Sequence, residues 1–336
     1  MALALSILLL AWPTVETGPL DSTSAIPACC GRPPPAGAAP AESDYDAAVD
    51  ADADAAGAEK ECRKLDADDP ALAEVLEQAE IVGKVSRLTG GNMIKYVFRL
   101  KDGSPEGLKV VFKPAQVGDW GDWKNEIAAY RIDQALGFRL VPATARRELP
   151  FSLFDLSDPK VAAALRPDAL EPPGPDETVE GALQVWVPSS HVAEEGEGRA
   201  WAEKMLTELG TTAGDLEDRV TAAVFVRLVI FDFLLSNPDR YSGGNMLRDS
   251  GGRYWAIDNA GAFVGCVRPK TDLLKLRRFE KVAVERLKKL DRKTLRTQLK
   301  GLLTDGRFRT FWKRRREVLE RVRELSSKLG KSKVLF

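Results

Sequence analysis

The sequence predicts an α+β protein of two lobes, in which an antiparallel sheet comes first and a mainly helical lobe follows. Three observations predict this class. Short apolar stretches separated by turn signals fill residues 81–113. Apolar and amphipathic helical patterns dominate the chain beyond Trp201. Two acidic residues, Asp239 and Asp258, follow apolar runs where sheet and helices are expected to meet.

The first 69 residues are predicted to lie outside the folded domain. Residues 2–12 form an uncharged apolar run of 11 residues, which is too short to span a bilayer and suits the core of a signal peptide. We therefore expect residues 1–30 to be a signal-like leader and the protein to be secreted or periplasmic. A cytoplasmic location is the alternative, because no Lys or Arg precedes the run. We expect no transmembrane span in the mature domain.

Residues 31–69 read as a disordered linker. They are acidic, rich in Pro and Ala, and contain almost no large apolar side chain. Such a segment buries too little surface to offset the entropy lost on ordering.

The cysteines and the single histidine do not indicate a metal site. Cys29, Cys30, Cys62 and Cys266 show no Cys-x-x-Cys spacing, and His191 adds only one further ligand. A structural zinc site is therefore not expected. A disulfide to Cys62 is left open, and His191 is expected in a surface loop.

Residues 70–190 are predicted to form the first lobe. Its turn between the first two strands contains Gly90 and Gly91, and its main helix stops at Gly137, because glycine favours the left-handed conformation that ends a helix. The predicted elements are a helix over 70–79, strands over 81–88, 93–100 and 108–113, a helix over 125–136 and a strand over 182–187.

Residues 191–336 are predicted to form the second lobe, with helices over 199–209 and 221–235 and an amphipathic helical series over 273–329. The net charge of the chain is −1, but residues 267–336 carry 24 Lys+Arg against 8 Asp+Glu, or +16, and the rest of the chain carries −17. We interpret the basic helices as a solvated face that balances the acidic front. Docking to an acidic substrate, a membrane or a nucleic acid is the alternative.

The acidic pair has the setting of a phosphoryl-transfer site. Asp239 and Asp258 lie 19 positions apart, and each precedes residues that favour a turn. Phosphoryl transfer needs one carboxylate to accept or orient the acceptor hydroxyl and another to bind Mg²⁺ or Mn²⁺. Asp239 is the candidate for the first role and Asp258 for the second. The alternative is that both only cap turns, as Asp often does.

The predicted sheet and the following helix supply a cation and its partner. Lys113 ends a strand and precedes Pro114, a setting that aims a lysine at nucleotide phosphates. Glu126, in the next helix, is placed to hold its ammonium group. The alternative for Lys113 is an exposed lysine at a sheet edge. A sheet followed by helices, with acidic motifs at the junction, is the layout of a two-lobed protein kinase-like fold.

Asn245 and two glycines complete the candidate site. Asn245 is expected as a second metal ligand, although it stands one position further from Asp239 than in the catalytic loop of protein kinases. Gly90 and Gly91 either cover the phosphates with backbone amides or form an ordinary hairpin turn. The sequence has no Gly-x-Ser-x-Gly and no Gly-x-x-x-x-Gly-Lys-Ser/Thr motif, which argues against a serine hydrolase and a P-loop enzyme.

These residues lie in motifs that resemble the secretory-pathway kinase family, which includes the Golgi casein kinase and four-jointed, together with its bacterial relatives. The motifs keep a consistent order along the chain. They are Lys113-Pro114, residues 125–133 and 136–142, Gly181-Ala182-Leu183-Gln184, residues 232–240 and Ile257-Asp258-Asn259.

The resemblance implies a role for each matched position. Lys113 would hold the phosphates of ATP, Glu126 would support that lysine, and Gln184 would lie on the strand that leads to the nucleotide hinge. Asp239 would serve catalysis, and Asp258 would bind Mn²⁺ or Mg²⁺.

Two residues depart from the family's pattern. Tyr241 stands where histidine usually follows Asp-Arg, and Ala260 displaces Gly261 from the usual Asp-Asn-Gly order. Neither change removes a charged group that the chemistry requires.

The sequence thus predicts an ATP-dependent phosphotransferase that acts on a hydroxyl group, with a protein as the expected acceptor. A phosphoinositide or a glycan is the alternative acceptor. An alternative of another class is a catalytically silent scaffold that binds partners through its basic helices. Nucleic acid is not an expected partner, because the basic end lacks a recognised binding motif.

Overall fold

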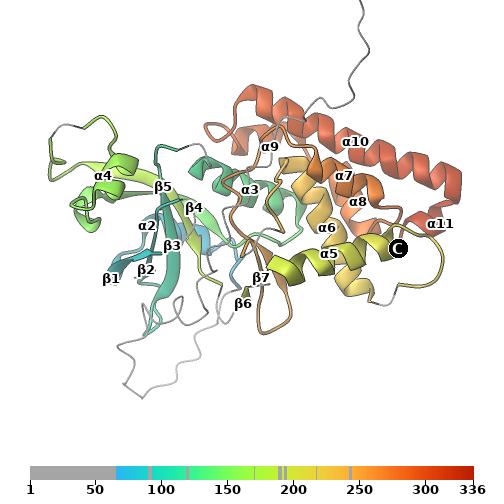
Figure 1. Cartoon of the computed structure of the whole chain (residues 1–336), viewed down its shortest axis with the longest axis horizontal. Coiled ribbons are helices and arrows are strands. Elements are labelled where there is room, and N and C mark those ends of the chain that lie inside the picture. Colours follow the sequence, from blue (N-terminus) through green and yellow to red (C-terminus); the bar gives the residue numbers. More distant parts are fainter. Residues whose placement is uncertain are drawn as a thin grey trace, which may run out of the picture.

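The computed structural model describes residues 66–336, except 90–92, 119–120, 170, 188–190, 193–194, 217 and 242–243, and has two lobes (Figure 1). The predicted leader and nearly all of the predicted linker lie outside the described residues, as do Cys29, Cys30 and Cys62. Among the helices that are described, none is long and apolar enough to cross a bilayer.

The first lobe is built on an antiparallel sheet of five strands in the order β1-β2-β3-β5-β4. Its middle strands are buried on both faces, which the runs of β-branched and aromatic residues in their sequences favour. The elements are α2 (Leu72–Gln78), β1 (Ile81–Leu88), β2 (Lys95–Leu100), β3 (Leu108–Pro114), α3 (Trp123–Leu136), β4 (Thr144–Pro150), the 3₁₀ turn η1 (Phe151–Leu153), α4 (Pro159–Leu165) and β5 (Thr178–Val185).

The predicted strands of this lobe all exist, with small shifts, but the prediction missed β4. This strand reads Thr-Ala-Arg-Arg-Glu-Leu-Pro and lies at the edge of the sheet. Edge strands tolerate charged residues and proline, so the apolar alternation that marks a strand is weak there. The last strand begins at Thr178 and ends at Val185, earlier than the predicted 182–187.

The second lobe is mainly helical, as predicted, and carries a small sheet of order β6-β7-β8. His191, expected in a loop, lies in β6, whose backbone pairs with Arg248 of β7. The elements are β6 (His191–Val192), α5 (Glu195–Leu209), α6 (Arg219–Leu235), β7 (Met246–Arg248), β8 (Tyr254–Ala256), α7 (Arg268–Lys275), α8 (Lys281–Lys289), α9 (Arg292–Gln298), α10 (Asp305–Leu329) and α11 (Lys331–Val334).

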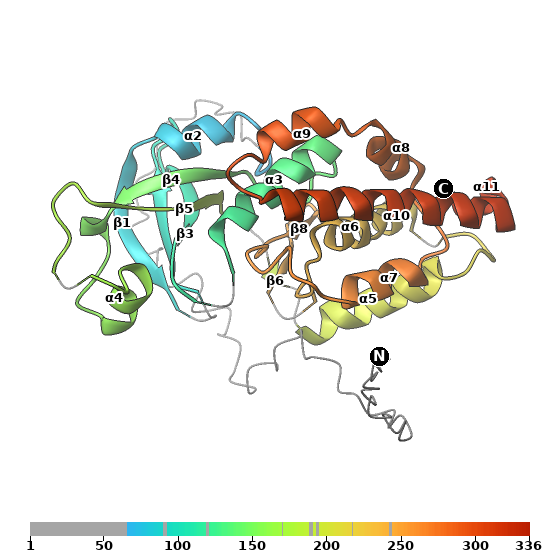
Figure 2. The ribbon, with the colours of Figure 1, turned by 90° about the horizontal axis from the view of Figure 1, so that it is seen from above.

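The predicted helical series over 273–329 is divided into separate helices. Asp291 caps the start of α9 by accepting from the Thr294 amide, and Thr304 caps the start of α10 by accepting from the Arg307 amide. Asp and Thr are favoured at such caps because they satisfy amides that lack a partner in the first turn. The caps separate three helices, of which α10 packs on α6, whereas α8 and α9 contact α3 (Figure 2).

Helix α3 lies at the junction of the two lobes. It contacts β4 and β5 of the sheet, and α8 and α9 of the helical lobe (Figure 2). Asp122 caps its first turn, and Gly137 ends it in the left-handed conformation, with φ of 60°. The predicted stop at Gly137 is therefore confirmed, and the helix carries Glu126 to the boundary between sheet and helices.

Residues 66–69, assigned to the linker from the sequence, pack at this same boundary. Asp68 is 2% exposed, and its Oδ2 atom lies 2.7 Å from Nε of Arg139 and 2.7 Å from Nη2 of Arg253. The Ala143 amide donates to the Ala67 carbonyl at 2.7 Å. Asp68 thus ties the segment before α2 to the loop after α3 and to the β7–β8 hairpin.

Gly181 allows β5 to lie against β3 at the end that carries Lys113. A Cβ atom at this position would stand 2.5 Å from the Lys113 carbonyl oxygen and 2.6 Å from the Phe112 ring. We expect Gly181→Ala to lower the free energy of unfolding by about 1–3 kcal/mol, measured by urea denaturation, because neither the backbone nor the buried ring can yield freely.

The matched control is Gly174→Ala, in the loop before β5. Its Cβ would approach only Glu177, at 3.6 Å, so its stability should change little. Equal destabilisation by both substitutions would contradict a special role for the Gly181 contact.

Candidate active site

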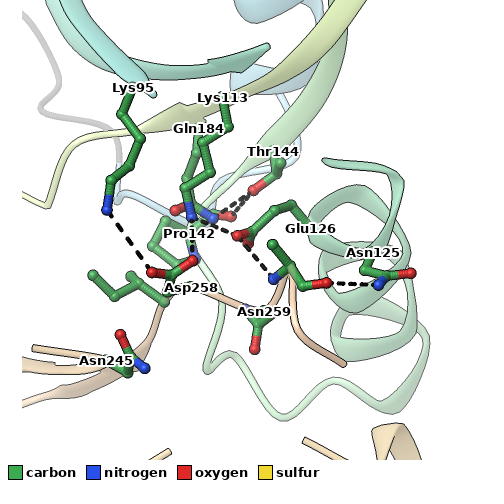
Figure 3. Close-up of polar contacts among 12 residues, drawn as sticks. Lys95, Lys113, Asn125, Glu126, Pro142, Thr144, Gln184, Asn245, Asp258 and Asn259 are labelled. Atoms are coloured by element: carbon green, nitrogen blue, oxygen red, sulfur yellow. Dashed lines mark hydrogen bonds and ion pairs between the residues drawn. The ribbon is translucent and has the colours of Figure 1, made fainter. Parts of the chain in front are cut away.

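The centre of the candidate site is a buried ion pair between the sheet and α3. Lys113, at the end of β3, is 4% exposed, and Glu126, in the first turn of α3, is fully buried. The Lys113 ammonium group donates to Oε1 of Glu126 (Figure 3). The structure therefore brings together the two residues that the sequence paired, and it excludes the alternative of an exposed edge lysine.

Asp258 completes a cluster around the same ammonium group. Its Oδ1 atom lies 3.3 Å from Nζ of Lys113, and its Oδ2 atom lies 3.9 Å from Nζ of Lys95, from β2 (Figure 3). Burial alone would lower the pKa of Lys113, but the Asp258 and Glu126 carboxylates offset this and raise it. The Lys113 ammonium in turn holds the pKa of Asp258 well below its usual range. Lys113 and Asp258 are therefore both charged at neutral pH.

Lys95 is a site residue that the sequence analysis missed. The strand was predicted, but its residues from Tyr96 to Phe98 are all buried, so alternation did not show which side chains face the other lobe. The Lys95 side chain reaches the site because β2 pairs with β3 and because the Asp258 segment of the second lobe lies against these strands.

Asp258 has an unusual backbone conformation, with φ of 54°. Aspartate tolerates this left-handed region better than most residues, at a cost of about 1–2 kcal/mol. The strain indicates that surrounding contacts fix the segment. Those contacts come from α3 on one side and from Arg240 on the other.

The contacts from α3 centre on Ala260. Its amide donates to Oε1 of Glu126 at 3.1 Å, and its carbonyl accepts from Nδ2 of Asn125 at 2.7 Å. Asn125 also donates to the Ala262 carbonyl at 3.0 Å. A Cβ at Gly121 would stand 2.7 Å from that of Ala260. The chain accommodates alanine in place of the family's glycine because a glycine faces it.

Arg240 makes the contacts from the other side. It is 2% exposed, and its Nη2 atom lies 3.0 Å from Asp232 and 2.6 Å from Oδ1 of Asn259. Its Nη1 atom donates to the carbonyls of Asn245 and Ile257 at 2.8 and 2.7 Å. A single buried guanidinium thus joins α6, the loop after it and the Asp258 segment.

Asp239 lies in that loop beside Asn245. Nδ2 of Asn245 donates to the Asp239 carbonyl at 2.8 Å and to its Oδ2 atom at 3.1 Å. Burial raises the pKa of Asp239, and the negative charge of Asp258 raises it further. The effect of Asp258 on Asp239 indicates that the two carboxylates share one electrostatic environment.

Tyr241, the other departure from the family's pattern, is buried within this loop, directly after Arg240. Burial raises its pKa well above the ordinary value, so the phenol stays neutral. Its bulk fills space next to Arg240 rather than adding a charge.

Gln184 lies on β5 beside Lys113 (Figure 3). It is 3% exposed, and its Nε2 atom donates to Oγ1 of Thr144 at 2.8 Å. Its role in nucleotide binding stays a prediction. Gly90 and Gly91 lie outside the described residues, and their role stays a prediction.

Asp258 and Asn245 stay the predicted ligands for a cation at the site. Because the amide nitrogen of Asn245 is turned to Asp239, its Oδ1 atom is the one left for a metal. Among the described residues, no group of three or more His, Cys, Asp or Glu side chains could hold a metal. A hard cation here would take its remaining ligands from water or from nucleotide phosphates, as Mg²⁺ commonly does.

No family model matches the chain, and no curated protein matches its sequence. Solved structures do match its fold. A hydra Fam20 solved with sugar gives a TM-score of 0.58 at 19% identity, over 79% of this chain and 91% of that chain. The Golgi casein kinase gives 0.56 at 18% identity, over 79% and 78%. The same kinase with Mn/ADP bound gives 0.57 at 19% identity, over 79% and 78%. The predicted kinase-like fold is therefore confirmed.

The contacts of Asn125 generate a prediction about the Asp258 segment. We expect Asn125→Ala to leave the Ala262 carbonyl without its donor and the Ala260 carbonyl with only the Asp122 amide as donor. The substitution should lower stability by about 1–3 kcal/mol and speed hydrogen exchange at the amides of residues 259–262. Lys124→Ala, one residue away on the same helix, serves as the control and should leave that exchange unchanged. Equal exchange in the two variants would show that Asn125 does not hold the segment.

Proposed function

We propose that this protein is an ATP-dependent phosphotransferase that moves the γ-phosphate of ATP to a hydroxyl group. The observation that carries this proposal is the cluster of Lys113, Glu126 and Asp258, with Asp239 in the same electrostatic environment. A buried ammonium fixed by a helix glutamate, beside one carboxylate for a metal and another for the acceptor, matches the needs of phosphoryl transfer.

The two lysines would bind the nucleotide. Lys113 is fixed by Glu126, and Lys95 approaches Asp258 from the neighbouring strand. Both ammonium groups lie against the Asp258 carboxylate, whose side chain is 33% exposed. Phosphate oxygens would take the place of this carboxylate beside the lysines.

The site fits Mn²⁺ or Mg²⁺. Asp258 and Oδ1 of Asn245 would hold the ion, which when bound would neutralise charge on the phosphates. The oxygen-only donor set suits a hard cation and does not suit zinc. The Golgi casein kinase with Mn/ADP bound, which shares the fold, supports the choice of nucleotide and ion.

Asp239 would act on the acceptor. The hydroxyl oxygen attacks the γ-phosphorus, the bond from that phosphorus to the oxygen of ADP breaks, and the hydroxyl proton passes to the Asp239 carboxylate. Its raised pKa favours this transfer, because a more basic carboxylate accepts a proton more readily.

The proposed acceptor is a protein, and a phosphoinositide or a glycan is the alternative. The fold shared with the Golgi casein kinase supports a protein acceptor and an extracytoplasmic location. A silent scaffold is the alternative of another class. The fit of Ala260 against Gly121 argues against it, because the departure from the family's pattern leaves the charged cluster in place.

The first test is transfer from labelled ATP with Mn²⁺ or Mg²⁺ to a protein library. We expect transfer, and we expect Asp258→Ala to lower its rate at least about 100-fold, since it removes the charge that holds the ion. Asp215→Ala, which removes an exposed carboxylate, should leave the rate unchanged.

Absence of transfer, autophosphorylation and ATP turnover, together with unchanged nucleotide affinity in Asp258→Ala, would rule the proposal out. Transfer to phosphoinositide vesicles or glycans but not to protein would reverse the order of acceptors. Full biological activity of a well-folded Asp239→Asn variant would support the scaffold.

The raised pKa of Asp239 predicts an acidic limit to activity. Only the ionised carboxylate accepts the proton, so the rate should be full above this pKa and should fall as the pH drops through it, at a pH above the ordinary 3.8 of Asp. We expect Asp239→Asn to lower kcat by about 10²–10⁴-fold and to abolish this limb of the pH–rate profile. Asp215→Asn should keep the limb. A limb that persists in Asp239→Asn would assign it to another group.

A further inference from the structure

A hollow of about 220 Å³ lies on the helical lobe, outside the candidate active site. We call it the α7–α10 hollow, because the end of α6, the start of α7 and one face of α10 enclose it. Its lining includes Phe233, Ser236, Lys270, Lys313, Arg314 and Glu317. Three cationic side chains thus face one carboxylate.

The cations of the hollow have no strong partners of opposite charge. Lys270, Lys313 and Arg314 form no ion pair with any carboxylate in the part of the chain that the structure describes. Glu317 lines the same hollow and offsets only part of the effect of burial, which keeps the pKa of Arg314 lowered. The hollow therefore keeps a surplus of positive charge.

Arg314 is the residue whose setting most requires a ligand. It is partly buried, and this burial lowers its pKa. Its Nη1 atom donates to the Leu234 carbonyl at 3.4 Å, which is long for a hydrogen bond. A guanidinium taken out of water without a good acceptor is costly, and an anion would remove that cost.

The neighbouring arginine shows the contrast. Arg315 donates to the carbonyls of Leu287 and Lys288 at 2.7 and 2.9 Å and stacks on Trp312, with its guanidinium 4.7 Å from the ring centre. It therefore serves the packing of α8 against α10. The basic run that the sequence shows as uniform is divided by the fold, with Lys313 and Arg314 turned to the hollow.

We infer that the α7–α10 hollow binds a phosphate group through Lys270, Lys313 and Arg314. Arginine and lysine are the side chains that bind phosphate most readily, and the volume admits a phosphate with part of the molecule that carries it. The source is either free phosphate or a phosphorylated side chain. The inference does not depend on the proposed function.

The hollow lies next to the loop that carries Asp239. Ser236, which lines it, ends α6 in the left-handed conformation three residues before Asp239. The Phe263 amide donates to the Leu235 carbonyl at 2.6 Å, so the segment after Asp258 is fixed to the same helix end. A bound phosphate would therefore join α6, α7 and α10 where both site loops meet the helical lobe.

The test is calorimetric titration of the full chain with inorganic phosphate and with a phosphoserine peptide, at constant ionic strength, against chloride. We expect saturable binding with a Kd of about 1 mM or tighter. Lys270→Gln combined with Lys313→Gln should weaken phosphate binding about tenfold or more, because each substitution removes a charged hydrogen-bond donor to the phosphate. The control is Lys289→Gln combined with Lys328→Gln, which removes two exposed lysines outside the hollow and should bind as the unaltered protein does.

The outcomes separate this site from the nucleotide site. Phosphate binding that persists in Lys95→Met but weakens in the hollow variant supports the inference, whether or not the protein transfers phosphate from ATP. Tighter binding of the peptide identifies a phosphorylated side chain as the source, and tighter binding of the ion identifies free phosphate. Absence of binding by both probes, or equal binding by the hollow and control variants, would overturn it.

Discussion

The rest of the site depends on one buried charge, the ammonium group of Lys113. A cation out of water is stable only with carboxylates beside it, and here Glu126 and Asp258 supply them from two different parts of the fold. The ion pair therefore requires α3 to lie against the end of β3 and the segment after β8 to reach across from the helical lobe. Loss of either carboxylate would leave the charge only partly compensated and loosen the contact between the lobes.

Two polar clamps hold the Asp258 segment in this position. Asn125 bonds the carbonyls after Asp258 from α3, and Arg240 bonds the carbonyl before it from the loop after α6. Because both donors are buried, each is costly to leave without its acceptor, and together they maintain the left-handed backbone of Asp258. The position of Asp258 is thus fixed by hydrogen bonds to the backbone on either side of it. Because these bonds do not involve the side chain of residue 260, an alanine there is compatible with an intact charged cluster.

The principal site residues were predictable because each stands in a local pattern. Lys113 ends an apolar strand, Glu126 opens a helix, and Asp239 and Asp258 follow apolar runs. Lys95 and Asn125 were not predictable in the same way. Lys95 reaches the site only through the pairing of β2 with β3, and Asn125 bonds to carbonyls 135 and 137 positions away. The polar edge strand β4 was missed because its burial is supplied by β5 and α2, not by its own alternation.

By itself the sequence determined the order of sheet and helices, the left-handed stop at Gly137 and the candidate carboxylates, because these follow from short-range periodicity and from the conformations that single residues favour. The tertiary structure decided which charges meet. In the folded chain Lys113 and Lys95 both lie beside Asp258. Within the basic run of α10, Arg315 packs against α8, whereas Lys313 and Arg314 line the α7–α10 hollow. The physical reason is that Coulomb energy and desolvation depend on distances in space, and residues far apart in the chain acquire those distances only when the lobes pack.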